Sequence, residues 1–227
     1  MAGMVSLPED QTQDQLATLR ARLDAVDAGI HRLVRERFEI VADIAAAKGP
    51  GETVIRPARE AAVIENRLSH HTGAMPRETL VHLWRVIVSA ACAAQRPMTI
   101  HIAGAVEAAR FLYGPVPARL HDRAGEAVAA LAASPGDVAV IDAATAEPWW
   151  RDRGTAHVIA RLPLADGGTA LAIGGEGVTR GTGPLALVAR DEAAPVEVSA
   201  ADIGPEDDVV GRYHPFPVTI PVAERTP

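Results

Sequence analysis

Apolar residues recur every three or four positions along residues 16–48, near the start of the chain. They are Leu16, Leu19, Leu23, Val26, Ile30, Leu33, Ile40 and Ile44. With neither proline nor a turn cluster before Gly49, this period predicts one continuous helix over residues 13–47, after a disordered tail over residues 1–12. Such a helix is roughly 50 Å long, too long for a small domain's other helices to cover. It therefore needs a partner of its own length.

Two shorter helices are predicted to follow the long one. Glycine and proline mark a loop over residues 49–56, and Pro57 suits the first position of a helix over residues 57–71. Gly73 and Pro76 interrupt the chain again, and an apolar stripe then predicts a third helix over residues 77–95, ending before Pro97. Residues 13–97 are therefore expected to form an all-α, three-helix domain.

After Pro97 the helical period gives way to short runs rich in β-branched residues. These runs predict strands at residues 99–103, 137–142, 157–162, 169–173, 185–189 and 218–222, with helices at 106–112 and 125–133. Residues 98–227 are expected to form a second, small α/β domain with a mixed sheet. Proline and aspartate are frequent after Ala193, which predicts looser packing near the end of the chain.

Polar residues interrupt the apolar stripe of each predicted helix. Arg37 continues the rhythm of the first stripe, and Lys48 lies eleven residues further on, about three turns, so both point the same way. Glu60 follows Arg59 one turn before Ile64 on the second helix, and Gln95 continues the stripe of the third. Because unpaired buried charge is costly, this set predicts an enclosed site for an anionic ligand that also carries a hydroxyl.

Arg20 is a further candidate on the first helix. It lies about 26 Å along the axis from Arg37, too far for both side chains to hold one small molecule within a single chain. If the long helix pairs antiparallel with its copy in a second protomer, Arg20 is expected to enter the partner's site.

The composition of the chain argues against several classes of protein. The 227 residues have a net charge of −7 with basic and acidic residues interspersed, which argues against nucleic-acid binding and a polybasic membrane anchor. The single cysteine, Cys92, excludes an intramolecular disulfide and suits a reducing compartment. The start of the chain lacks the features of a signal peptide, and no window is apolar enough to span a membrane. We expect a cytoplasmic protein.

Three segments together resemble the all-helical (type II) chorismate mutases, including the mutase domains fused to prephenate dehydratases. They are LATLRARLDAVDAGIHRLVRERFEIVADIAAAK, RPAREAAVI and LWRVIVSAACAAQ. The resemblance covers about residues 13–96. It implies an intertwined homodimer that converts chorismate to prephenate by a Claisen rearrangement, without cofactor or metal, in phenylalanine and tyrosine biosynthesis.

The resemblance also implies a role for each site residue. Arg20, from the other protomer, and Arg37 bind the carboxylates of the substrate. Lys48 and Gln95 approach the ether oxygen of the breaking bond. Arg59 and Glu60 match the Arg-Glu pair at the start of the second helix, where the glutamate holds the ring hydroxyl.

The chain departs from the pattern of this family at two positions. Ala91 stands where many members have serine, so one hydrogen bond to a substrate carboxylate is absent or comes from Ser89 or water. Arg56 stands three residues before Arg59, where aspartate is frequent. Both departures bear on the efficiency of catalysis more than on the identity of the reaction.

The second domain has only a faint likeness to one lobe of a dehydratase-like fold, carried by DVAVIDAATAEPWW and HVIARLPL. Thr179 and Arg180 resemble a Thr-Arg dipeptide of prephenate dehydratases, but Gly181 replaces the phenylalanine that follows it there. The segment GGEGVTRGTG is expected to be a turn, because it lacks the order of a phosphate-binding loop. We therefore expect a degenerate dehydratase-like or regulatory domain, and truncation after Arg96 is expected to preserve mutase chemistry.

Two other functions compete with the mutase. An isochorismate pyruvate lyase uses similar cations on the same helical fold, but those enzymes lack the glutamate after the second-helix arginine, so Glu60 favours the mutase. A non-catalytic dimeric regulatory protein is the other alternative. Charged residues at buried positions argue against it, because a pure dimerisation helix would be more stable with apolar residues there.

Overall fold

The computed structural model describes residues 9–48, 52–190 and 193–223. Its chain forms two compact units, Met1–Gly49 and Pro50–Pro227. Long N-terminal helices followed by a mixed sheet confirm the predicted fold class. The compact units meet between Gly49 and Pro50, whereas the sequence predicts a domain boundary after Pro97. That boundary stays a prediction.

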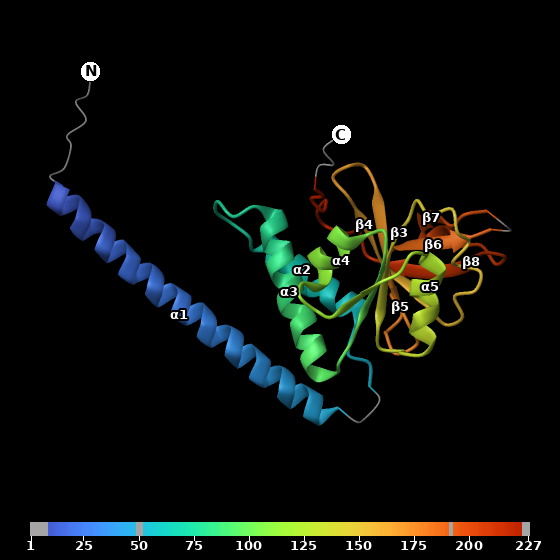
Figure 1. Ribbon diagram of the computed structural model, residues 1–227, viewed down its shortest axis with the longest axis horizontal. Helices are drawn as coiled ribbons and strands as arrows, with labels where there is room; N and C mark the ends of the chain where they lie inside the picture. Colours follow the sequence, from blue (N-terminus) through green and yellow to red (C-terminus); the bar gives the residue numbers. More distant parts are fainter. Residues whose placement is uncertain (1–8, 49–51, 191–192, 224–227) are drawn as a thin grey trace, which may run out of the picture. The chain divides into compact units, whose positions relative to one another are not determined.

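The first unit is the helix α1 (Glu9–Ala47), drawn in blue in Figure 1. It is unbroken, as predicted, but it starts four residues earlier, so residues 9–12 of the predicted tail are helical. Residues 1–8 of that tail lie outside the described residues. The eight apolar residues of the α1 stripe all remain 40–60% exposed.

The second unit begins with two helices close to their predicted bounds. Helix α2 (Pro57–Ser69) has proline in its first turn and ends two residues before the predicted end. Helix α3 (Arg77–Gln95) has the predicted bounds. Between them the chain turns through Gly73, whose φ of 98° favours glycine over residues with a Cβ.

One eight-stranded sheet forms the rest of this unit, in the order β2-β1-β3-β5-β4-β8-β6-β7. Strands β1, β2 and β3 are parallel, whereas β5 pairs antiparallel with both β3 and β4. The short helices are α4 (Val106–Tyr113) and α5 (Ala124–Ala129), with 3-10 turns at Ala130–Ala132 and Ala200–Asp202. The strands are β1 (Ile100–Ala103), β2 (Ala118–Leu120), β3 (Val138–Asp142), β4 (His157–Pro163), β5 (Thr169–Gly174), β6 (Leu185–Ala189), β7 (Val196–Ser199) and β8 (Asp208–Tyr213).

Near the C-terminus two predictions are wrong. Residues 218–222 do not form a strand, and Ile220 makes only an isolated bridge to Leu164. Pro217 and Pro221 lack backbone N–H groups and so cannot complete a ladder. Looser packing after Ala193 is wrong for β8, which lies inside the sheet between β4 and β6 and buries Val210 completely, whereas β7 is mostly exposed. Strands β2, β7 and β8 were not predicted.

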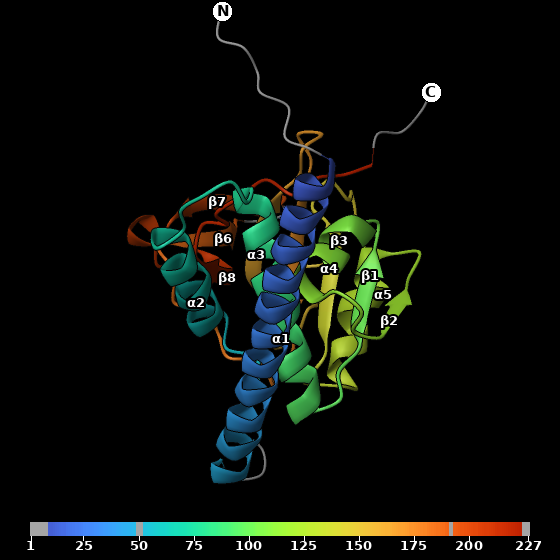
Figure 2. The ribbon, with the colours of Figure 1, turned by 90° about the vertical axis from the view of Figure 1, so that its left-hand side faces the viewer.

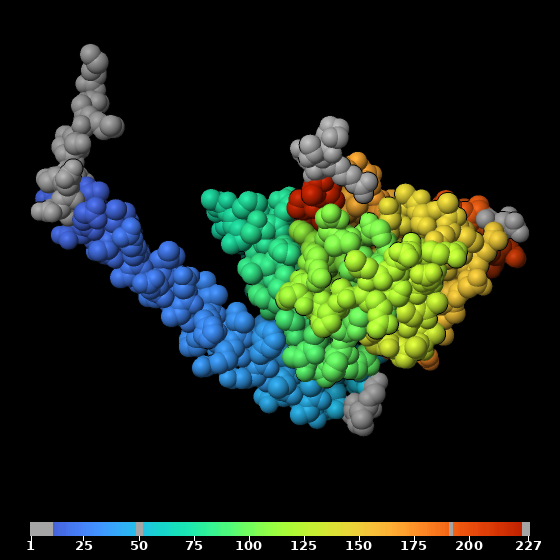
Figure 3. All heavy atoms as spheres, viewed as in Figure 1, coloured from blue at the N-terminus to red at the C-terminus, as the bar shows by residue number. Residues whose placement is uncertain are grey.

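Two apolar cores lie on the two faces of the sheet, as the alternation along β3 illustrates. Val138 and Val140 join one core, whereas Ala139 and Ile141 join the other. Helices α2, α3 and α4 contribute to the first core, and α5 to the second. Both ribbon views place α3 beside α4 (Figures 1 and 2). In the space-filling view these helices and the sheet are packed together without a gap (Figure 3). Helices α2 and α3 therefore share a core with the sheet.

Across the described ranges no helix combines the length and the apolar character that crossing a bilayer requires.

Candidate functional site

Three of the predicted site residues lie in the first unit. Arg20 and Arg37 are on α1, and Lys48 follows it directly, with its backbone N–H donating to the carbonyls of Ile44 (3.1 Å) and Ala45 (3.3 Å). Because the helix is continuous, Arg37 and Lys48 keep the three-turn separation that places them on one face. Both are partly buried, whereas Arg20 is exposed. The first unit therefore presents two cations on one face, Arg37 and Lys48, and a third far along α1.

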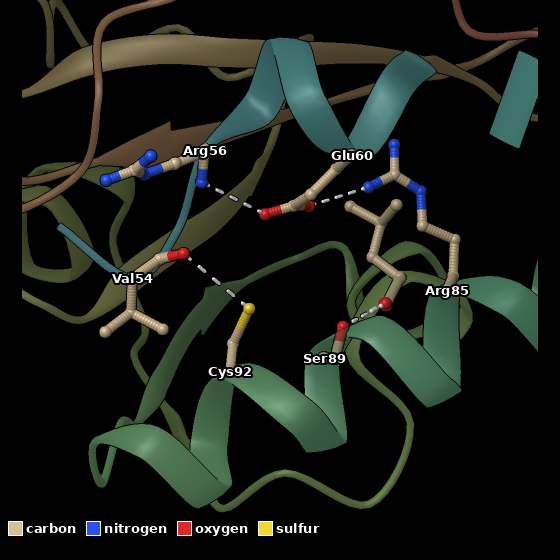
Figure 4. A network of polar contacts seen from close by, with 7 residues as sticks. Val54, Arg56, Glu60, Arg85, Ser89 and Cys92 are labelled. Carbon is tan, nitrogen blue, oxygen red and sulfur yellow. Dashed lines mark hydrogen bonds and ion pairs between the residues drawn. The ribbon is translucent and has the colours of Figure 1, made fainter. Parts of the chain in front are cut away.

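The carboxylate of Glu60 is held from two sides. Glu60 lies in the first turn of α2, where the backbone N–H of Arg56 donates to its Oε1 at 3.3 Å. Arg85 on α3 donates from Nη1 to Oε2 at 3.1 Å, and both side chains are largely buried, at 13% and 14% exposed (Figure 4). Because an N-terminal helix turn favours negative charge, this environment keeps Glu60 in place as a hydrogen-bond acceptor.

Arg85 is a further candidate site residue, which the predictions from the sequence do not include. It lies four residues after Val81 and three before Val88, both of which are buried in the core. An arginine between two core positions of one helix stripe is the same signal that identified Arg37. Its guanidinium also lies over the ring of Phe216, 5.4 Å from the ring centre.

The other two predicted site residues of this unit are Arg59 and Gln95. Arg59 is exposed on α2. Gln95, the last residue of α3, is partly buried and donates from Nε2 to the carbonyl of Ala91 at 3.1 Å. Within the described ranges no hydrogen bond joins Arg59 or Gln95 to Glu60. The structure thus holds Glu60 by hydrogen bonds in which Arg59 and Gln95 take no part.

The two departures from the family pattern have local explanations. Ala91 is buried, and the nearby Ser89 hydroxyl already donates to the carbonyl of Leu112 at 2.8 Å (Figure 4). This bond joins α3 to α4, so Ser89 does not replace the missing serine. Arg56 forms an ion pair with Glu52 at 2.9 Å and donates from Nε to the carbonyl of Thr53. Its side chain therefore serves the loop before α2.

The glycine-rich segment of the sheet has a packing role. It turns after β5, as predicted, and the backbone N–H of Thr179 donates to the carbonyl of Ile55 at 3.1 Å. The hydroxyl groups of Thr179 and Thr53 are also hydrogen-bonded, at 2.8 Å. This contact ties the turn to the segment that leads into α2. Within the described ranges no group of three His, Cys, Asp or Glu side chains is placed to hold a metal ion.

The first unit thus carries three cations, and the second unit carries a fixed carboxylate on α2 and a core that α2 and α3 share with the sheet. The model of the type II chorismate mutase family matches residues 19–96. Residues 19–96 are therefore similar to this family, which confirms the resemblance inferred from the sequence. The matched segment contains all six predicted site residues.

Curated relatives match the same part of the chain. Each is a bifunctional chorismate mutase/prephenate dehydratase. The protein from Pseudomonas aeruginosa is 34% identical over 98 residues, 40% of this chain and 27% of its own length. That from Neisseria gonorrhoeae is 38% identical over 95 residues, 41% of this chain and 26% of its own. The chain thus spans about a quarter of the length of these relatives. No solved structure matches it significantly.

Proposed function

We propose that the protein is a chorismate mutase, which converts chorismate to prephenate in the biosynthesis of phenylalanine and tyrosine. The observation that carries this proposal is the family match over residues 19–96, because that segment includes every residue proposed to act on the substrate. The names of the curated relatives include the same activity. The largely buried Glu60 adds support, since a lyase of this fold is not expected to carry it.

The proposed mechanism needs no nucleophile or base. The rearrangement requires a dianion held in its compact reactive conformer and hydrogen-bond donors aimed at the oxygen that gains charge. Arg37 and Arg20 bind the two carboxylates, with Arg59 beside them. Lys48 and Gln95 donate to the ether oxygen.

Glu60 accepts the ring hydroxyl of the substrate in this mechanism. A carboxylate offers about four lone-pair sites, and Arg56 and Arg85 use two of them. Acceptor capacity therefore remains for a hydroxyl, while both protein donors keep the carboxylate from rotating away. This fixed geometry is one part of the mechanism that the second unit supplies.

We further propose that the protein is a homodimer paired through α1. Eight large apolar side chains on one stripe of α1 are 40–60% exposed, and burying them in water-free contact is favourable by about 25 cal/mol per Å². An antiparallel second copy of α1 supplies a stripe of equal length. It also brings Arg20 toward the partner's Arg37 and Lys48. A cytoplasmic location is part of this proposal, because the single, buried Cys92 suits a reducing compartment.

The first test is turnover by the purified full-length protein. We expect chorismate absorbance to fall on adding the protein, with prephenate as the product. Isochorismate is assayed in parallel, with release of pyruvate as the readout. Pyruvate release without prephenate formation would replace the mutase with the lyase, and a folded protein that leaves both substrates unchanged would refute an enzymatic function.

A subunit-exchange experiment tests the shared site. Arg20→Ala and Arg37→Ala homodimers are each expected to lose most turnover, because each removes one carboxylate ligand. A mixed dimer regains one intact site if Arg20 acts in the partner. Recovery of up to about half of the wild-type turnover per exchanged dimer is therefore expected. No recovery after demonstrated exchange would place Arg20 outside the partner's site.

For residues 98–227 we propose a regulatory role without dehydratase activity. Thr179, which resembles a dehydratase residue in sequence, uses its hydroxyl and backbone N–H to hold the segment before α2. Incubation with prephenate tests this proposal, and formation of phenylpyruvate would contradict it.

A further inference from the structure

The glycine-rich segment that follows β5 is packed against the rest of its unit through its backbone. The N–H of Gly177 donates to the carbonyl of Pro135 at 2.9 Å, and a Cβ on this glycine would lie 2.8 Å from the same oxygen. A Cβ on Gly181 would overlap the carbonyl oxygen of Arg212 on β8. Because these close approaches leave no room for movement, the segment holds Thr179 at a fixed place beside the sheet.

Thr179 in turn holds the segment that leads into α2. Its hydroxyl lies 2.8 Å from that of Thr53, and its backbone N–H donates to the carbonyl of Ile55 at 3.1 Å. Between these two residues, the carbonyl of Val54 accepts from the Sγ–H of Cys92 on α3, at 4.0 Å (Figure 4). The segment before α2 is thus fixed by the glycine-rich segment and by α3 together.

The peptide group between Ile55 and Arg56 connects Thr179 to Glu60. Its carbonyl accepts from the N–H of Thr179, and its N–H donates to Oε1 of Glu60 at 3.3 Å. This peptide is trans, so its C=O and N–H point in opposite directions from one rigid plane. A bond on the carbonyl side therefore limits the rotation of the N–H on the other side. Hydrogen bonds in such a chain also polarise one another.

We propose that Thr179 is a positioning residue for Glu60 and couples the sheet to the proposed mutase site. It fixes the Ile55–Arg56 peptide, which together with Arg85 fixes the carboxylate. In the proposed function, on which this inference rests, Glu60 accepts the ring hydroxyl of chorismate. The glycine-rich segment then acts on the mutase site without touching the substrate.

Steady-state kinetics of Thr179→Val in the full-length protein test this coupling. Valine is close to threonine in shape but removes the hydroxyl that is bonded to Thr53. The KM for chorismate is expected to rise about threefold, the effect of one weakened hydrogen bond. The kcat should stay nearly the same, because Glu60 holds a hydroxyl that takes no part in the bond changes.

Thr179→Ser is the conservative variant, because it keeps a hydroxyl at this position. It is expected to return KM to the wild-type value. A lower kcat at unchanged KM in Thr179→Val would overturn the proposal, since that result indicates a smaller folded fraction and not a displaced acceptor.

A chorismate analogue with hydrogen in place of the ring hydroxyl separates an effect through Glu60 from other causes. The analogue offers Glu60 no hydroxyl to hold, so Thr179→Val is expected to leave its KM unchanged. An equal rise in KM for chorismate and for the analogue would overturn the proposal, because the effect would then not pass through Glu60.

Thr145→Val is the matched control in another loop of the same unit. It removes a threonine hydroxyl that accepts from the N–H of Glu147 at 3.3 Å, after β3. This variant is expected to keep the wild-type KM and kcat. A rise in KM as large as that of Thr179→Val would overturn the proposal, because any lost loop hydroxyl would then have the same effect.

Amide hydrogen exchange, followed by NMR, tests the same chain of bonds without substrate. The N–H of Arg56 is expected to exchange about threefold faster in Thr179→Val than in the wild type, and at the wild-type rate in Thr145→Val. An unchanged rate in Thr179→Val would overturn the coupling. A wild-type protein that leaves chorismate unchanged would refute the proposed function instead, so the two failures have different readouts.

Discussion

Helices α1 and α3 are both amphipathic, yet the apolar face of α1 is exposed and that of α3 is buried. In α1 every large apolar residue of the stripe stays at least 40% exposed. In α3, Val81, Val88 and Cys92 are buried in the core that the helix shares with the sheet. The period of a helix thus identifies the apolar face that needs a packing partner, but it does not identify that partner. For α3 the packing partner is the chain's own sheet, and for α1 we propose that it is a second copy of the chain.

The comparison extends to the chemistry of the proposed site. The first unit supplies the cations Arg20, Arg37 and Lys48, whereas the second unit supplies the acceptor Glu60 and the amide of Gln95. The acceptor is fixed by its neighbours before any substrate arrives. Four predictions test this contrast.

The largest effect is expected from truncation. In the structure, α2 and α3 share a core with the sheet, so we now expect a fragment of residues 1–96 to lose its cooperative folding, contrary to the expectation from sequence. A fragment of residues 50–227 keeps that core whole and should retain a cooperative thermal transition. Circular dichroism during heating compares the two. A cooperative fragment 1–96 with mutase turnover would show that α1 alone can cover α2 and α3.

The next effect concerns the chemistry of α1. Lys48→Ala is expected to lower kcat by about 10²- to 10³-fold, the usual cost of removing one preorganised donor to a developing oxyanion. Arg32→Ala is the control on the same helix, because Arg32 forms an exposed ion pair with Glu36 and should change kcat little. Steady-state kinetics and sedimentation measure turnover and dimer mass. Similar kcat values for the two variants would remove Lys48 from the site.

A smaller effect is expected at the pair that fixes Glu60. Arg85→Met leaves a largely buried carboxylate without its cation, which typically costs about 3 kcal/mol. Arg56→Met breaks the exposed pair with Glu52 and should cost less than about 1 kcal/mol. Urea unfolding measures both free energies. Equal losses would mean that the Glu60–Arg85 pair behaves as a surface pair and does not fix the acceptor.

The smallest effect concerns pH. Burial lowers the pKa of His157. The unfolded chain therefore takes up more protons below about pH 6.5, the ordinary pKa of histidine, and the free energy of unfolding should fall as pH falls through this range. His157→Leu should flatten the dependence in part only, because burial also lowers the pKa of His121.

Urea unfolding at several pH values measures this slope. The control is His31→Gln on α1, which should keep the full dependence. A slope that His157→Leu leaves unchanged would mean that other groups determine it.

Local pattern was enough to predict the helices and the buried strands. The bounds of α3 and β6 follow directly from their apolar runs, and Pro57 fixes the start of α2. The strands that pattern missed lie at the sheet edges, where β2 and most of β7 are exposed, or in a segment rich in aspartate, where β8 lies. An edge strand owes its conformation to pairing with a neighbour, so its own sequence carries a weak signal.

The candidate site divides in the same way. The sequence by itself determined which residues of the helices are polar where apolar residues are expected, and its resemblance to a family gave each of them a role. Only the tertiary structure decided that Arg85 holds Glu60 and that the sheet covers α2 and α3. The reason is physical: helical period is a local property of consecutive residues, whereas an ion pair across 25 residues and a shared core depend on which distant segments the fold brings together.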